Sequence, residues 1–323
     1  MYPWGAMPEE HHYVPRFYLK GFTENKKLWV YERHQKPRES KPKDEASRPD
    51  FYSLDADETG ERNDAPEKQL ARIESIAAPI IRKLVTPHYV LTPEKAAELI
   101  FFIALTFVRT PAWREHLNRV AVKAKRDHDI KLAQNKEPFY EMLREMDTQK
   151  KITEADYEKL RQMFLSGDYE LEQKSAGFNL WAMFTSGMQV AEIIAEFQYQ
   201  AHYAPQGMEF FTSDNPVYTV GPDDEGSMVV GTGFGRPDVR VYFPLNKHAC
   251  FYMRRGIRTM AILTTSTFVD QANYLTMLTA TKNLYTSKCL RRTMLLFNQN
   301  GCKVKAGENA FMAEPSPPDW RQS

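Results

Sequence analysis

The sequence predicts an α+β fold, in which a helical middle packs on a mainly antiparallel sheet. Two observations favour this class. Apolar residues recur at helical spacing through much of residues 63–204. Short apolar runs separated by Gly and Pro turns fill residues 205–323, which is typical of antiparallel strands. We expect N-terminal strands within residues 1–62 to join the C-terminal sheet across the helices, which gives a single domain over residues 1–323.

The N-terminal part contains two short strand candidates. Leu28-Trp29-Val30-Tyr31 and Phe51-Tyr52-Ser53-Leu54 are apolar and aromatic enough for strands. The stretch from Gln35 to Pro49 is polar, charged and proline-bearing, which is typical of an exposed loop.

Helix signals dominate the middle of the chain. Asp64 can cap a helix with Glu67 three residues later, and Pro79 should kink that helix. A second helix starts at Thr92 and is interrupted near Pro111. Further helices are expected over Ala112–Ala133, from the capping box Thr153–Asp156 to Gly167, and over a buried segment marked by Trp181, Phe184, Met188, Ala191 and Ala195.

The last third changes to strand-like runs. A helix from about Thr267 to Lys282 and an apolar piece at Met294–Phe297 follow them. The strand candidates are Met208–Ser213, Val217–Val220, Met228–Val230, Val239–Phe243 and Ala249–Met253.

Composition limits the classes of function. The 323 residues carry a formal net charge of +1, so no long-range field attracts nucleic acid, although a local basic groove stays open. Cys250, Cys289 and Cys302 form no metal-type pair and are odd in number, which predicts a reducing, cytoplasmic compartment. The longest apolar run, Leu99–Val108, is roughly half of a membrane span, so we expect no membrane partner.

The stretch His11–Phe22 holds the densest set of reactive side chains. His11 and His12 are adjacent, and imidazole suits a metal ligand or a general base because its ordinary pKa lies near neutrality. In a strand, neighbouring residues face opposite sides, so only one histidine can point into a given pocket. The alternative is that one histidine is solvated and the other is hydrogen-bonded in the core.

One resemblance is local. His12-Tyr13-Val14-Pro15 is similar to the His-hydrophobic-x-Pro opening of HNH-type nucleases, and Asn25 and His34 follow at a spacing close to that family's Asn and second His. The resemblance implies that the first histidine activates water, the second helps to hold a divalent metal, and the Asn orients the first. His11 stands where that family has an acidic ligand, and Leu28–Tyr31 predicts a strand where it has a helix.

A second resemblance covers nearly the whole chain. It is carried by the blocks His11–Phe22, Leu28–Tyr31, Arg109–Pro111, Thr212–Val217, Tyr242–Leu245 and Gln271–Tyr274. In these blocks the chain resembles domain-of-unknown-function family 4238, which implies one integral domain and brings no established activity.

Three further positions are candidates for binding. Asp214 ends a strand and opens a turn, so its carboxylate either binds a metal or orients His12, or else forms an Asx turn with the local backbone. Arg109 ends a long apolar helix face, so it is either an anion clamp or a snorkelling end residue. Asn273 either contacts a ligand or serves the backbone, and Glu74 is a weaker carboxylate candidate.

Two functions therefore stay open. The first is a cytoplasmic metal-assisted phosphodiesterase or nuclease, a hydrolase that uses Mg²⁺ or Mn²⁺ and acts on nucleic acid. The alternative is a non-catalytic binding or regulatory domain whose motif blocks are packing and turn elements. For the first, the expected roles are His12 as base, Arg109 as phosphate clamp, His11, His12 and Asp214 as metal ligands, and Arg16, Asn215 and Asn273 as substrate-binding residues.

Overall fold

The structure is a computed structural model of the chain. It divides into two compact units, one made of Met1–Arg114 with Ala176–Ser323 and the other of Glu115–Ser175. No linker-like stretch sets the second unit apart in the sequence, so the single-domain prediction did not include it. The residues that the structure describes are 10–54, 63–87, 89–147, 153–167, 169, 176–223 and 225–299.

Short strands and single helical turns make up the N-terminal residues. The strand predicted at residues 28–31 is confirmed as β2, whereas residues 51–54 form a turn with one isolated bridge from Leu54 to Asn63. Two strands also lie in the stretch predicted as a loop, because their backbones pair with β1 and β2. The elements are β1 (Glu10–His12), α1 (Arg16–Leu19), the 3₁₀ turn η1 (Lys20–Phe22), β2 (Leu28–Glu32), β3 (Arg38–Ser40), the 3₁₀ turn η2 (Pro42–Asp44) and β4 (Ser47–Pro49).

The middle of the chain is helical, as predicted. Thr92 caps α3 by accepting a hydrogen bond from the Lys95 N–H, and Thr153 with Asp156 forms the predicted capping box of α6. Gly167 ends α6 in the left-handed conformation that glycine adopts without strain. The helices are α2 (Ala65–Leu84), α3 (Pro93–Val108), α4 (Pro111–Gln134), α5 (Lys136–Met146), α6 (Glu154–Ser166) and α7 (Ala176–Ala195).

The C-terminal part alternates strands with two helices. Its first strand begins at Gln198, a few residues before the predicted boundary at 205. The elements are β5 (Gln198–Tyr203), β6 (Thr212–Ser213), β7 (Tyr218–Pro222), β8 (Met228–Val230), β9 (Arg240–Asn246), β10 (Ala249–Arg254), β11 (Met260–Leu263), α8 (Ser266–Thr279), β12 (Asn283–Thr286) and α9 (Arg291–Gln299).

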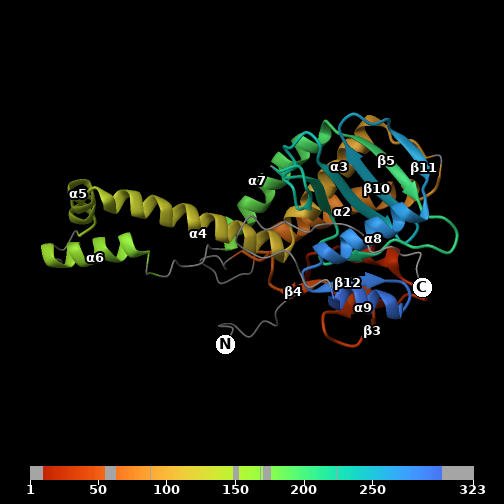
Figure 1. Cartoon of the computed structure of the whole chain (residues 1–323), viewed down its shortest axis with the longest axis horizontal. Helices are drawn as coiled ribbons and strands as arrows, with labels where there is room; N and C mark the ends of the chain where they lie inside the picture. The colour runs from red at the N-terminus through yellow and green to blue at the C-terminus, as the bar shows by residue number, and fades with distance from the viewer. Residues whose placement is uncertain are drawn as a thin grey trace. The chain divides into compact units, whose positions relative to one another are not determined.

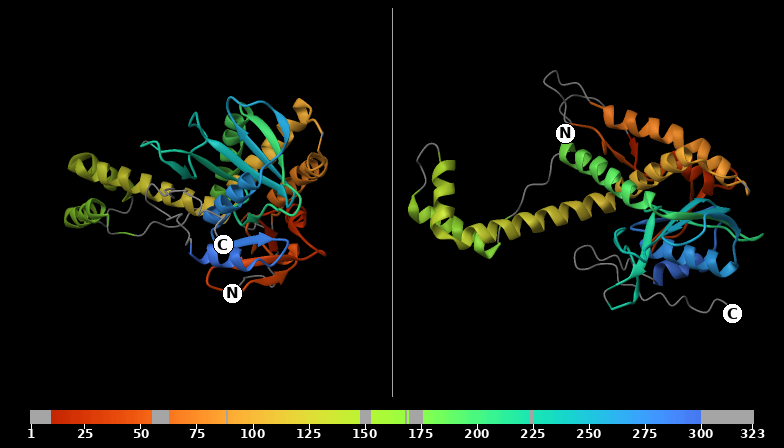
Figure 2. Two further views of the ribbon diagram at one scale, coloured as in Figure 1. Left: turned by 45° about the vertical axis from the view of Figure 1, so that its right-hand side comes forward. Right: turned by 90° about the horizontal axis from the view of Figure 1, so that it is seen from above.

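A six-stranded sheet forms the centre of the larger unit. Its order is β11-β5-β10-β9-β7-β8, and every pair is antiparallel except β11 with β5. One face carries Val241, Phe243 and Phe251, which join a large core with residues of α2, α3 and α7. The other face packs on α8 through Tyr242 and Tyr252. Figures 1 and 2 show α8 and the helices α2, α3 and α7 on opposite sides of this sheet.

A smaller sheet joins the two ends of the chain. Its order is β3-β2-β12-β6, so N-terminal β2 pairs with C-terminal β12, which meets the expectation of a sheet built from both ends. Successive residues of β12 face opposite sides. Leu284 packs with Phe297 of α9, whereas Tyr285 joins the large core together with Tyr13. The α+β class is therefore confirmed, with its strands divided among separate sheets.

The buried face of α7 differs from the predicted one. Trp181 and Met188 are 64% and 51% exposed, whereas the buried stripe contains Gly187 and Ile194. This helix is apolar on both faces, so periodicity alone selects the wrong one. The close approach of α3 at Gly187 decides the face, because a Cβ there would lie 2.6 Å from Leu105 Cδ2.

The second unit has its own small core. The end of α4 with α5 and α6 buries an aromatic cluster that includes Phe139, Tyr140 and Tyr157. On α4, Lys125 pairs with the buried Asp129.

Among the described residues, no single helix is both long and apolar enough to cross a bilayer, and α3 with α4 passes that test only as a bent pair.

Candidate functional site

His11 and His12 occupy opposite faces of β1, as the strand pattern predicted. His11 is buried, its Nδ1 accepts a hydrogen bond from the Tyr52 N–H at 2.9 Å, and its ring stacks on that of Tyr52. His12 is half-buried and its Nε2–H donates to the Lys43 carbonyl at 3.1 Å. Burial lowers the pKa of His12 below the ordinary value of 6.5, so its ring is neutral at pH 7.

Arg109 lies at the centre of a buried network. Its Nε donates to the Tyr52 hydroxyl at 3.2 Å, Nη1 to Glu74 at 2.8 Å and Nη2 to the His12 carbonyl at 2.6 Å. Only 2% of the arginine is exposed. The predicted phosphate clamp therefore has its guanidinium directed to protein groups, where it fastens β1 to α2 and to the turn at residue 52.

Asp214 is held by the segment that precedes β12. Its Oδ1 accepts a hydrogen bond from the Thr281 N–H at 2.8 Å, and its Oδ2 accepts from Lys282 at 2.7 Å and Asn283 at 3.1 Å. Neighbouring Asn215 donates to the Thr279 carbonyl at 2.9 Å. Burial raises the pKa of Asp214 to about 6, although the three backbone donors act in the opposite direction.

The remaining predicted site residues lie elsewhere. Asn273 donates to the Glu209 carbonyl and accepts from the Phe211 N–H, both at 2.8 Å, so its amide serves the backbone. Arg16 is exposed at the start of α1. His34 has a positive φ and lies in the turn after β2, where the HNH pattern expects a helix.

The predicted metal ligands do not come together. His11 and His12 are absent from the lining of the cavity that contains Asp214. Across the described part of the chain, no three His, Cys, Asp or Glu side chains form a group that could hold a metal ion. The set of His11, His12 and Asp214 is corrected accordingly, because the β1 pairing turns the two histidines toward Tyr52 and Lys43.

A polar cavity of 250 Å³ surrounds Asp214 and Asn215. One side of the cavity is the turn that follows β6, the strand that pairs with β12. The other side is the segment that contains η2 and β4. The other lining residues are Tyr13, Asp44, Glu45, Ala46, Ser47, Arg48, Pro111, Ala112, Thr281, Lys282 and Asn283.

Two buried polar side-chain atoms of β12 lack a partner, and one of them belongs to a residue that lines this cavity. Among the residues that the structure describes, neither Asn283 Oδ1 nor the Tyr285 hydroxyl has a hydrogen-bond partner. Asn283 lines the cavity and is 9% exposed, while Tyr285 is fully buried. Tyr285 is not part of the cavity lining; burial raises its pKa, and Tyr13, Asp214 and Glu45 raise it further, whereas the Asn283 side chain lowers it.

Sequence reasoning missed both β12 residues, as well as Tyr13 and Glu45. One signal was present, because Asn is disfavoured within a strand and Asn283 begins one. Glu45 carries no comparable signal, since its burial depends on the bidentate contact from Arg38.

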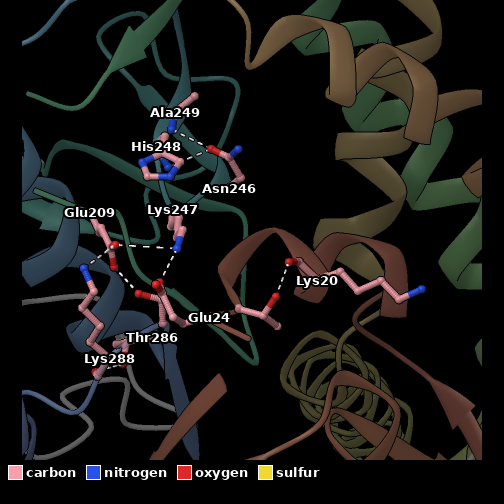
Figure 3. Close-up of polar contacts among 11 residues, drawn as sticks. Lys20, Glu24, Glu209, Asn246, Lys247, His248, Ala249, Thr286 and Lys288 are labelled. Carbon is pink, nitrogen blue, oxygen red and sulfur yellow. Dashed lines mark hydrogen bonds and ion pairs between the residues drawn. The ribbon is translucent and has the colours of Figure 1, made fainter. Parts of the chain in front are cut away.

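A second polar cluster is fully paired (Figure 3). Lys247 Nζ lies 2.6 Å from Glu24 Oε2 and 3.8 Å from Glu209 Oε1, and Lys288 Nζ lies 3.1 Å from the same Glu209 oxygen. The Lys247 N–H also donates to the Gly21 carbonyl. This cluster joins the end of the histidine stretch to the β9–β10 turn and is structural.

Comparison with known proteins gives one match. The family described as Protein of unknown function (DUF4238) matches residues 10–289. Neither curated proteins nor solved structures gave a match to the chain.

Proposed function

We propose that this chain, which belongs to the DUF4238 family, is a non-catalytic binding or regulatory domain whose cavity at Asp214 takes a small polar ligand. The observation that carries the proposal is Asn283 Oδ1, an acceptor that lines the cavity and has no partner in the described residues. Buried polar groups are normally hydrogen-bonded, and one left open beside a cavity favours a missing ligand.

The roles of the motif residues support the same proposal. Four motif residues form hydrogen bonds with backbone or side-chain groups of the chain itself. They are His11, Arg109, Asp214 and Asn273. These bonds hold the surrounding backbone in place, and of the four residues Asp214 alone is in the cavity lining. The motif blocks are then packing and turn elements, and binding of the ligand is the function.

A screen with a blocked cavity tests this function. Thermal shift would be measured for the protein with a library of small amines, amino acids, sugars, phosphates and divalent metal salts. Ala112 lines the cavity, so Ala112→Trp should abolish any shift. Ala124→Trp, on an exposed position of α4, is the matched control and should retain it. Shifts that survive Ala112→Trp, or no shift with any compound, would contradict the proposal.

Metal-assisted cleavage of nucleic acid is the second candidate. Its supporting observation is His12, whose Nε2–H is committed to the Lys43 carbonyl. The lone pair then lies on Nδ1, and the lowered pKa keeps the ring neutral, as a general base requires. Substrate and water would have to supply part of the ligands of a divalent metal.

A cleavage panel tests the second candidate. Single- and double-stranded DNA and RNA would be incubated with the protein in Mg²⁺, Mn²⁺ or chelator. Metal-dependent cleavage that disappears in His12→Ala and persists in His248→Ala, an exposed histidine, would establish it. Intact substrates throughout would refute it.

We also infer a cytoplasmic location from the cysteines. Cys250 is buried and Cys289 is exposed, and both are free thiols. Free thiols persist in a reducing compartment. Cys302 lies outside the described residues.

A further inference from the structure

The floor of the Asp214 cavity is rich in hydrogen-bond acceptors. Asp214 Oδ1 accepts one backbone N–H, so one of its lone pairs is still open. Asn283 also lines the cavity, and its Oδ1 is without a partner among the described residues. A ligand that binds here must therefore bring donors.

The negative charge of Asp214 is also uncompensated. Asp214 is 4% exposed, and within the described chain no Lys, Arg or His side chain forms an ion pair with it. The other carboxylate of the floor, Glu45, is 3% exposed and already bound bidentately by Arg38. Buried charges in proteins are normally paired, so the floor lacks one positive charge.

Cations occur instead at the entrance. Arg48 and Lys282 line the cavity and are both exposed, and Lys282 reaches Glu32 at 3.4 Å. Asp44 is the exposed acidic residue of the same lining. The polarity of the cavity therefore changes from acceptors at the floor to mainly cationic side chains at the entrance.

On the basis of the proposed binding function, we propose that the ligand is a small molecule with a primary ammonium group at one end and a carboxylate at the other, an amino acid or short ω-amino acid. The ammonium is a hydrogen-bond donor, which matches the open acceptors of Asp214 and Asn283. Its charge pairs with that of Asp214, and its carboxylate faces Arg48 and Lys282.

Size and chemistry favour this class over the alternatives. A cavity of 250 Å³ is small for a binding site, so the ligand has few heavy atoms. A phosphate or other anion would meet Asp214 and Glu45 at the floor. A neutral sugar would leave the Asp214 charge unpaired.

A matched ligand series tests the class by calorimetric titration. β-Alanine carries both groups, propylamine only the ammonium and propionate only the carboxylate. We expect β-alanine to bind most tightly, propylamine more weakly and propionate not at all. Binding of propionate as tight as that of β-alanine would overturn the ammonium assignment.

Two matched Asn→Ala variants separate a ligand contact from a structural one. Asn283→Ala removes an acceptor of the cavity lining without a described partner, so the melting temperature should change little, while β-alanine binds about tenfold more weakly. Asn273→Ala removes an amide that accepts from the Phe211 N–H and donates to the Glu209 carbonyl, both at 2.8 Å. It should lower the melting temperature and leave binding unchanged. Equal binding by wild type and Asn283→Ala would overturn the assignment.

The outcome also distinguishes this inference from the proposed function. If no member of the ligand series binds but another library compound gives a shift that Ala112→Trp abolishes, the ammonium class is wrong and the binding function stands. If no compound gives such a shift, both are wrong.

Discussion

Replacing Asp214 with Asn should change how the stability of the protein depends on pH. The pKa of Asp214 rises from its ordinary value of 3.8 to about 6 because the carboxyl group is buried. The folded state therefore binds this proton more tightly than the unfolded state does. The resulting stabilisation is fully present below pH 4 and is lost as the pH rises through about 6.

The magnitude follows from the size of this rise. A difference of about 2 in pKa between the two states corresponds to about 3 kcal/mol, since one pKa unit is 1.36 kcal/mol. Asn carries no charge at any pH. The free energy of unfolding of the wild type should thus fall relative to that of Asp214→Asn by about 3 kcal/mol between pH 4 and pH 7.

Urea unfolding of both proteins at several pH values measures this difference directly. Subtracting the variant removes the titration of all groups that the two proteins share. A difference that does not change with pH would refute the reasoning. A change of the opposite sign would mean that the three backbone donors of Asp214 outweigh its burial.

Two further substitutions test the packing of the larger unit. Arg109→Gln leaves Glu74 without its cation and should lower the free energy of unfolding by about 3–5 kcal/mol in urea titrations, whereas a loss below about 1 kcal/mol would contradict the buried network. Gly187→Ala places a methyl group against Leu105 and should lower it by about 1–3 kcal/mol, while Gly233→Ala, which meets nothing within 4 Å, serves as the control and should have little effect on it. Equal stability of the two glycine variants would contradict the close contact of α3 with α7.

Most of the fold could be predicted from the periodicity and the turn signals of the sequence. The capping residue Thr92, the capping box at Thr153 and the terminating Gly167 are local features, so the sequence locates them well. The buried face of α7 could not be predicted from the sequence, because its apolar residues lie on both sides. Contact with α3 decides which side is buried.

The candidate site could be predicted from the sequence only in part. Asp214 was identified from its place at a strand end, and its alternative role as a turn residue that binds backbone was stated with it. The partners of Asp214 are the N–H groups of residues 281–283, which lie far away in the sequence. The open acceptor of Asn283 depends on which groups fail to reach it. No local sequence pattern indicates that a buried acceptor will lack a hydrogen-bond partner.

A crystal structure of the protein with β-alanine at neutral pH would test the central claim most directly. We expect the ligand nitrogen at hydrogen-bond distance, about 3 Å, from Asp214 and Asn283 Oδ1, with the carboxylate toward Arg48 and Lys282. A ligand bound with its carboxylate on the floor, or a cavity that contains only water at saturating ligand, would contradict the claim.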